Sequence, residues 1–168
     1  ARICGGEVTA IATAEIESGH GWTSATVTSV TEGGDDTVGW HADVVFSSTR
    51  RVLIDEDYRW PLPSDAPGGF QLADTDNSPT IDSYAVQSFS FDGATETYST
   101  TIRVSFSEQP TGASRALTYA YRSASASESA ATGYCVGGGV LRERWQDTCG
   151  LIPGSMLTRP VLGFKETF

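Results

Sequence analysis

Apolar and polar residues alternate with a period of two along most of the chain, and the alternating runs are rich in β-branched and aromatic residues. Gly, Asp, Asn and Pro bound these runs, as they do at turns between strands. Short strands at this spacing predict an all-β fold, either an antiparallel β-sandwich or a jelly-roll-like barrel with long loops. The predicted strands cover 7–16, 22–30, 37–46, 50–54, 83–91, 96–106, 115–122 and 135–145.

The chain is expected to form a single β-sandwich domain over residues 1–168, because this length can bury one substantial core and no linker divides it. Two segments interrupt the alternation. The segment 57–79 is rich in proline and predicts a long loop. The segment 122–133, RSASASESAATG, has low complexity and predicts either a flexible loop or a short helical stretch.

The clearest local unit is a hairpin around Asp92–Gly93, a dipeptide typical of tight turns because glycine adopts a positive φ without steric cost. On the outgoing strand, Tyr84 and Val86 share one parity, whereas Phe89 and Phe91 share the other. Such a change of phase within one strand predicts a β-bulge. The return strand is expected to present a core face made of Tyr98, Ile102, Val104 and Phe106.

A second hairpin is predicted to turn at Gly33–Gly34, which would pair Ala25 with Ala42 and Val27 with Trp40. This register sends His41 and Asp43 to the outer, polar face, with His41 opposite Thr26. His20, the other histidine, would then lie about 20 Å away, too far to share a metal ion with His41.

His41 and Asp43 could act as a general base and the group that orients it, because residues two apart on a strand are neighbours on one face. However, no sequence motif places a serine or cysteine nucleophile beside them. We therefore favour a solvated strand pair, and we expect no catalytic residues and no cofactor.

The net charge of -10, from 21 acidic and 11 basic residues, disfavours nucleic acid and anionic membranes as partners. No apolar run is long enough to span a membrane as a helix. With three cysteines, at most one intrachain bridge forms; the possible disulfide joins Cys135 and Cys149 and would contribute about 3 kcal/mol in an oxidising compartment. We expect a protein made without an export signal, although Ala1 is equally compatible with methionine removal and with signal cleavage.

Two acidic clusters are candidate sites. The first has oxygen ligands at a spacing that calcium loops use, but it lacks the glycine and the distal glutamate of an EF-hand, so Asx turns are the favoured interpretation; it contains Asp74, Asp76, Asn77 and Asp82. The second combines carboxylates with aromatic rings, as glycoside hydrolysis would require, but a solvated acidic turn is favoured; it contains Asp55, Glu56, Asp57, Tyr58 and Trp60.

These observations favour a non-enzymatic structural protein of a virus particle, a head-decoration or tail component of a tailed bacteriophage that assembles through β-sheet surfaces. Its partners would be further copies and other particle proteins, and Arg59, Trp60 and Phe168 are the expected interface anchors. The alternative is a secreted carbohydrate-binding β-sandwich that stacks glycan rings on Tyr58, Trp60 and Trp22. A glycoside hydrolase or lyase is the third interpretation.

Overall fold

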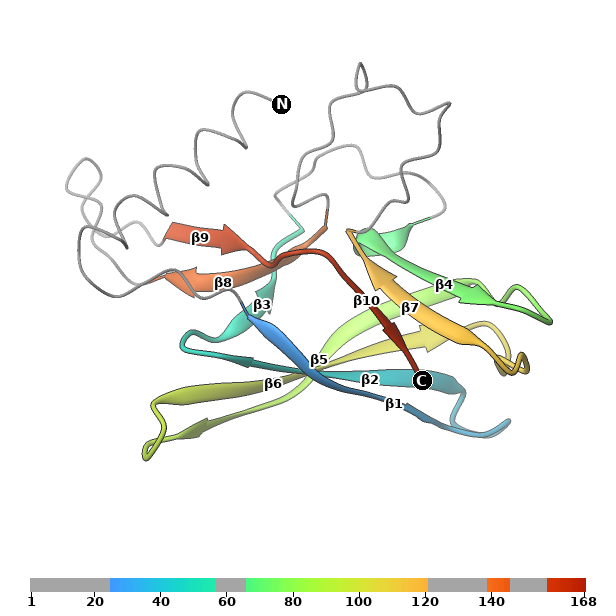
Figure 1. Ribbon diagram of the computed structural model, residues 1–168, viewed down its shortest axis with the longest axis horizontal. Helices are drawn as coiled ribbons and strands as arrows, with labels where there is room; N and C mark the ends of the chain where they lie inside the picture. Colours follow the sequence, from blue (N-terminus) through green and yellow to red (C-terminus); the bar gives the residue numbers. More distant parts are fainter. Residues whose placement is uncertain (1–24, 57–65, 121–138, 146–156) are drawn as a thin grey trace, which may run out of the picture.

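The computed structural model describes residues 25–56, 66–120, 139–145 and 157–168, which form three antiparallel sheets (Figure 1). Sheet A has the strand order β1-β2-β6-β5, sheet B has the order β3-β8-β9, and sheet C has the order β10-β7-β4. The strands are β1 (Thr26–Gly33), β2 (Trp40–Ser48), β3 (Val52–Ile54), β4 (Phe70–Asp74), β5 (Ile81–Asp92), β6 (Thr97–Phe106), β7 (Arg115–Tyr119), β8 (Leu141–Trp145), β9 (Leu157–Pro160) and β10 (Phe164–Thr167).

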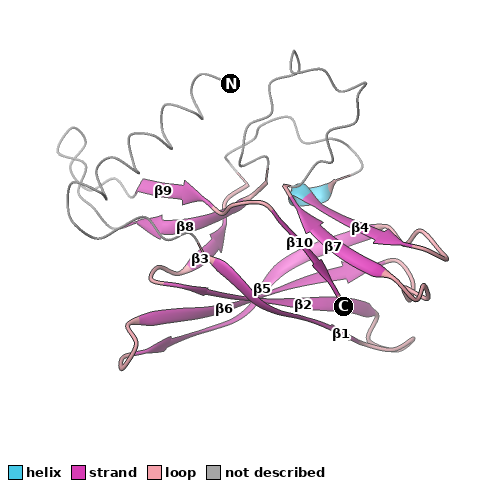
Figure 2. Ribbon diagram, viewed as in Figure 1, coloured by secondary structure: helices cyan, strands magenta, loops and turns pink. Residues whose placement is uncertain are grey.

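Sheet A forms one layer, and sheets B and C lie against different parts of its inner face (Figure 1). Within the described ranges, the only helical element is the single 3₁₀ turn Pro67–Gly69 (Figure 2). The prediction of an all-β, antiparallel sandwich is therefore confirmed, and the three sheets remain open rather than closing into a barrel. No helix in this part of the chain is long and apolar enough to cross a membrane.

A connected series of aromatic rings joins sheet A to sheet C. Phe70, Tyr119 and Phe164 share one register position on neighbouring strands, so the pleat directs all three toward the same face. Tyr119 lies between its neighbours, with ring centroids 4.9 Å from Phe70 and 5.7 Å from Phe164. Phe164 then meets Phe46 of β2 at 5.7 Å, and Phe70 meets Tyr84 of β5 at 5.8 Å. These contacts form the centre of the core.

Sheet B contributes two buried charged residues from its central strand. Arg142 and Glu143 are adjacent on β8 and both are buried. The Glu143 carboxylate accepts a hydrogen bond from the hydroxyl of Ser48, the last residue of β2. This hydrogen bond connects sheet B to sheet A. Replacing Ser48 would be costly, because a buried carboxylate oxygen of Glu143 would lose a hydrogen-bond donor.

The hairpin of β5 and β6 confirms the predicted bulge. The register between the two strands shifts between Val86 and Ser88, where the sequence changes phase. The prediction about the turn is wrong in one respect: Glu96, not Gly93, has the positive φ, at 53°. Asp92 shapes this turn by accepting hydrogen bonds from the Ala94 amide and the Thr95 hydroxyl.

The predicted register of the first hairpin is wrong. Thr26 pairs with Ser47, and Gly33 pairs with His41, so the connection runs through residues 34–39 rather than turning at Gly33–Gly34. Asp35 sets this loop, because its carboxylate accepts the amides of Thr37 and Val38. Since the Asp35 side chain begins the turn, β1 extends to Gly33 and the chain returns to β2 only at Trp40.

The interpretation of 57–79 as one long loop is also wrong, because residues 66–79 include the 3₁₀ turn and strand β4. β4 pairs with β7 from Phe70 to Asp74, and its short run FQLAD has only two large apolar residues by which to recognise a strand. Strands β9 and β10 were likewise not predicted. The predicted strand 7–16 and the segment 122–133 lie outside the described residues.

Candidate functional site

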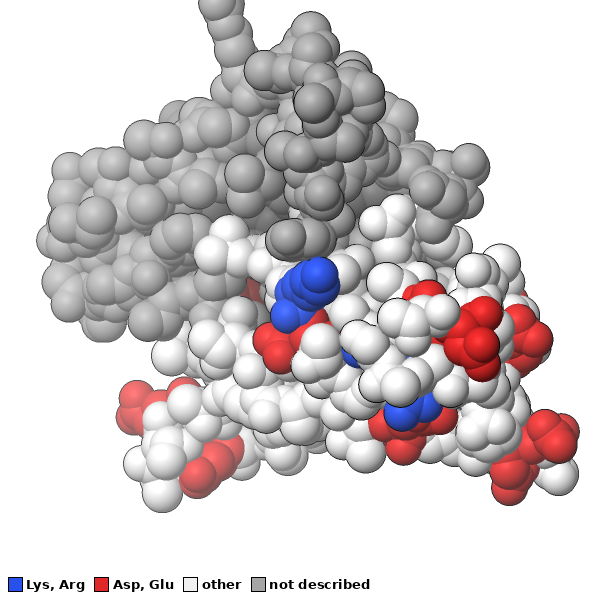
Figure 3. Space-filling model, turned by 45° about the vertical axis from the view of Figure 1, so that its right-hand side comes forward, with Lys and Arg blue, Asp and Glu red and all other residues white. Residues whose placement is uncertain are grey.

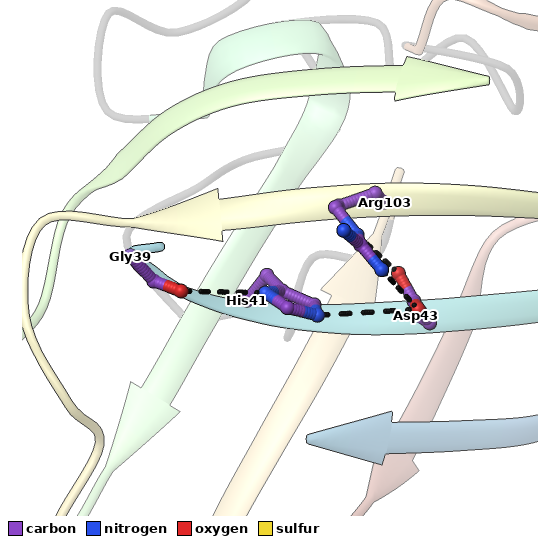
Figure 4. Close-up of polar contacts among 4 residues, drawn as sticks. All are labelled: Gly39, His41, Asp43 and Arg103. Atoms are coloured by element: carbon purple, nitrogen blue, oxygen red, sulfur yellow. Dashed lines mark hydrogen bonds and ion pairs between the residues drawn. The ribbon is translucent and has the colours of Figure 1, made fainter. Parts of the chain in front are cut away.

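A histidine, an aspartate and an arginine side chain form a group on the outer face of sheet A. The sequence analysis identified the histidine and the aspartate of this group as a candidate pair. His41 and Asp43 lie two residues apart on β2, and Arg103 lies directly across from Asp43 on β6 (Figure 4). Their neighbours Ala42 and Val44 are buried on the inner face. The prediction that His41 and Asp43 share the outer face is therefore confirmed, and Arg103 is the member that the sequence analysis missed.

Asp43 and Arg103 form a two-pronged ion pair. Nε of Arg103 donates to Oδ1 of Asp43 at 2.8 Å, and its Nη2 donates to Oδ2 at 2.7 Å. The hydrogen bonds from this guanidinium hold the pKa of Asp43 below its ordinary value, and Asp43 in turn raises the pKa of Arg103. The side chains are 27% and 34% exposed, so solvent screens the pair in part.

His41 is more enclosed than a surface histidine, with only 13% of its side chain exposed. Its ring lies over Gly33 on β1, where a β-carbon would come within 2.8 Å of Nε2. Nδ1 lies 3.4 Å from the carbonyl oxygen of Gly39, and Nε2 lies 4.0 Å from Oδ2 of Asp43. The expected position opposite Thr26 is wrong, because His41 faces Gly33.

This geometry does not supply a base with its orienting carboxylate. Both oxygens of Asp43 are bound by Arg103, so the carboxylate is aimed across the sheet rather than along the strand toward His41. Ser105 is the residue directly across from His41 on β6, yet no hydrogen bond connects the two side chains in the part of the chain described. The arrangement is that of a structural ion pair with a packed histidine beside it.

The cluster proposed as a cation site forms a loop contact instead. Asp74 accepts hydrogen bonds from the amides of Asp76, Asn77 and Gly112, at 2.7, 3.2 and 3.1 Å. These amide bonds lower the pKa of its carboxyl group against an opposing effect of desolvation, which is the largest single contribution. Thr111 donates hydrogen bonds to the side chains of Asp76 and Asn77, from its hydroxyl and its amide respectively. These bonds connect the loop after β4 with the loop after β6.

No group of three or more His, Cys, Asp or Glu side chains is placed to hold a metal ion within the described residues. Asp82, the fourth residue of the candidate set, is exposed on β5, where its carboxylate accepts a 3.5 Å hydrogen bond from Thr80. The favoured interpretation of this cluster as Asx turns agrees with the amide contacts of Asp74.

The acidic turn after β3 is described only in part. The amide of Asp55 donates to the carbonyl oxygen of Val140, and the carboxylate of Glu56 accepts a 3.3 Å hydrogen bond from the hydroxyl of Tyr84. Asp57, Tyr58 and Trp60 lie outside the described residues. Asp55 and Glu56, the two described residues of this cluster, therefore form hydrogen bonds with other parts of the fold.

Of the three predicted interface anchors, the structure places one. Phe168 is half-buried against the core, its amide donates to the carbonyl oxygen of Arg115, and the Arg115 guanidinium lies 5.5 Å from its ring centroid. Arg115 also forms a 2.6 Å ion pair with Glu32 of β1. Other sequence candidates lie outside the described residues: Trp22, Arg59, Trp60, Cys135 and Cys149.

The sequence analysis did not recognise a pair of exposed aromatic side chains on β5. Phe89 and Phe91, near the end of β5, are 51% and 54% exposed. Phe91 packs against Tyr98 of β6 with ring centroids 4.7 Å apart, and the guanidinium of Arg51 lies 3.6 Å from the Phe89 centroid. We call these four residues the aromatic end of sheet A.

The bulge explains why these rings are where they are. Phe89 pairs with Thr100 and Phe91 with Tyr98, on the strand where Ile102 and Val104 face the core. The extra residue at the bulge keeps Phe89 and Phe91 on the inner face that Tyr84 and Val86 also occupy. The apolar inner face therefore continues along the hairpin beyond the part that the other described strands cover. The change of phase was the sequence signal that could have placed both rings on the inner face.

The sequence matches no protein-family model, and it has no significant match among curated proteins or solved structures.

Proposed function

We propose that this protein is a non-enzymatic structural component of a virus particle, a head-decoration or tail protein of a tailed bacteriophage, and that it assembles through the aromatic end of sheet A. The single observation that carries the assembly role is the exposure of Phe89 and Phe91 at 51% and 54%. A particle setting fits the acidic, β-rich and Gly-rich character of the chain.

The chemistry of this surface is that of an interaction site. Aromatic and arginine side chains supply most of the binding free energy at protein interfaces, and here Phe89, Phe91 and Tyr98 lie beside Arg51. Each ring already contacts a neighbour, so little side-chain freedom would be lost on binding. On the face of the molecule shown in Figure 3, acidic side chains occur in several groups, and the few basic ones lie next to acidic ones.

Particle purification tests the proposed function. Particles released by a culture that carries the gene are separated on a density gradient, and each fraction is examined by mass spectrometry for peptides of this chain. We expect the peptides to migrate with the particles. Their absence from every particle fraction, with the chain present in the soluble fractions, would contradict the proposal.

A pair of matched variants links this result to the aromatic end. Phe89→Ser with Phe91→Ser removes the rings, whereas Ser88→Ala with Ser90→Ala changes the alternate, outward positions of the same strand. We expect only the first pair to lose incorporation into particles while keeping a wild-type circular dichroism spectrum. Equal incorporation of both pairs would show that assembly uses another surface.

A secreted carbohydrate-binding module makes a different prediction. Its proposed stacking residues, Trp22, Tyr58 and Trp60, lie outside the described part, and the outer face of sheet A carries Ser and Thr but no Phe, Tyr or Trp among the residues described. Retention of the purified chain on a polysaccharide column, together with its absence from particles, would replace the structural role with glycan binding.

A further inference from the structure

β5 is a long edge strand whose only charged residues, Asp82 and Asp92, lie near its two ends. It lies at the end of sheet A, and no described strand pairs with its outer edge. Its residues 83–91, SYAVQSFSF, contain no Asp, Glu, Lys, Arg or Pro. Proteins ordinarily protect such an edge with charges, prolines or a covering element, because its free N–H and C=O groups can pair with another strand. Within the described part of the chain, residues 88–91 have no charge, proline, bulge or covering strand, so this part of the edge is suited to a partner strand.

We propose that the partner strand is β5 of a second copy, paired antiparallel over residues 88–92 about a two-fold axis at Ser90. This inference rests on the proposed assembly role and names the partner of the same surface. It commits to a homodimer contact in which sheet A continues from one copy into the next, since a two-fold axis perpendicular to the sheet keeps both inner faces on the same side.

The register follows from which side chains share a face. With Ser90 opposite the partner's Ser90, Phe89 faces the partner's Phe91 and Phe91 faces the partner's Phe89. All four rings then lie on the inner face, because directly opposed residues of an antiparallel pair point to the same side. Cross-strand aromatic pairs stabilise sheets. The bulge lies before Ser88, so residues 88–92 form an unbroken ladder with β6 and present a regular outer edge.

Charge also favours this edge over the others. Two copies that each carry a net charge of -10 repel one another, so a contact between them is least unfavourable where charges are few. In the proposed register the only charged residue, Asp92, faces the partner's Ser88 and meets no other carboxylate. The other edge strands of the described sheets have shorter uncharged runs than residues 83–91: β3 has only three residues, and charges interrupt β1 at Glu32, β4 at Asp74, β9 at Arg159, and β10 at Lys165 and Glu166.

Cysteine cross-linking tests this register. Ser90 on the axis would face its own copy at a Cα separation of about 5 Å, which a disulfide can span. Ser99 on β6 is the matched control. It pairs with Ser90 and is also exposed on the outer face, but β6 is not an edge strand of sheet A. Ser90→Cys and Ser99→Cys are oxidised at equal concentration, with the unaltered chain as background for its three cysteines.

We expect Ser90→Cys to give covalent dimers about tenfold or more in excess of Ser99→Cys, with mass spectrometry showing the peptide around position 90 linked to itself. Sedimentation of the unaltered chain should show a reversible dimer, and Phe89→Ser with Phe91→Ser should weaken its dissociation constant about tenfold or more. Equal cross-linking of the two cysteine variants, or a monomeric unaltered chain at high concentration, would overturn the β5 dimer.

The two proposals fail in different ways. If the chain is monomeric yet the Phe89 and Phe91 variant no longer enters particles, the aromatic end binds a different particle protein and only the dimer is wrong. If the chain dimerises through β5 but is absent from particles, the dimer stands and the particle role is wrong.

Discussion

The hydroxyl of Tyr119 accepts a hydrogen bond from the backbone amide of Leu141 at 2.7 Å, and this bond joins the central strands of sheets C and B. Both residues are fully buried. Burial raises the pKa of the Tyr119 phenol, so the group stays neutral at every ordinary pH. The Tyr119 hydroxyl therefore connects the two sheets from inside the core.

Tyr119→Phe should lower the free energy of unfolding by about 1–3 kcal/mol, because the buried amide of Leu141 would lose its acceptor. Urea unfolding followed by fluorescence measures the change. Tyr98→Phe is the control, since Tyr98 is only half-buried and its hydroxyl has no hydrogen bond among the described contacts. Equal losses in the two variants would show that the Tyr119 hydroxyl is not needed.

Gly139→Ala should destabilise the fold by about 1–3 kcal/mol, because the added β-carbon would lie 2.2 Å from the Tyr119 ring. Neither partner can move easily, since Tyr119 is packed between Phe70 and Phe164. Thermal unfolding is a sufficient measurement. Gly93→Ala provides the comparison: its nearest described neighbour is 4.0 Å away, and its φ is not positive, so that variant should unfold like the unaltered chain.

Asp43→Asn should lower stability at neutral pH by about 1 kcal/mol, since it removes the ionic partner of Arg103. The pKa of Asp43 is lower in the folded than in the unfolded chain, so its contribution is complete above the unfolded value of about 4 and is lost as pH falls through the folded value. The variant should therefore converge with the unaltered chain as the pH falls below the folded pKa of Asp43.

Urea midpoints measured from pH 7 down to pH 2 test this convergence. Asp82→Asn, on the same sheet but without an ion pair to Arg or Lys among the described contacts, serves as the control. A constant difference between the Asp43 variant and the unaltered chain across this range would mean that packing, not charge, explains the loss.

Glu96→Gly should raise stability by up to about 1 kcal/mol, because Glu96 has a φ of 53°, a conformation that costs a residue with a β-carbon about 1–2 kcal/mol. The greater freedom of glycine in the unfolded chain offsets part of this gain. Glu108→Gly makes the same chemical change at an exposed position without a positive φ, and it should destabilise. Destabilisation by both variants would contradict the strain at Glu96.

The sequence predicted the fold class and the β5 bulge because both depend on alternation, which is a local property of the chain. It failed at the first hairpin, where Gly33–Gly34 resembled a turn but the Asp35 side chain begins the real one one residue later. It missed β4 and β10 because each has few apolar residues and is recognisable only once β7 lies between them.

The candidate site was predicted to the extent that its residues share one strand. His41 and Asp43 were placed on one face from their spacing, but Arg103 lies 60 positions away from Asp43 and no local pattern connects them. The aromatic end was missed for the opposite reason. Alternation marks Phe89 and Phe91 as core residues, and only the extent of the opposing sheets determines that they are exposed.

The contact between Ser48 and Glu143 spans 95 positions of the chain, whereas each of the two hairpins pairs neighbouring strands. Local hairpins can form within about 1–10 μs, but pairings between distant segments require large loops to close first. Folding should therefore have two kinetic phases of very different rate, with the joining of sheet B to sheet A as the slow one, on the order of milliseconds to seconds. During that interval the uncharged segment 83–91 of β5 is already formed and exposed, so the yield of refolding should fall as protein concentration rises.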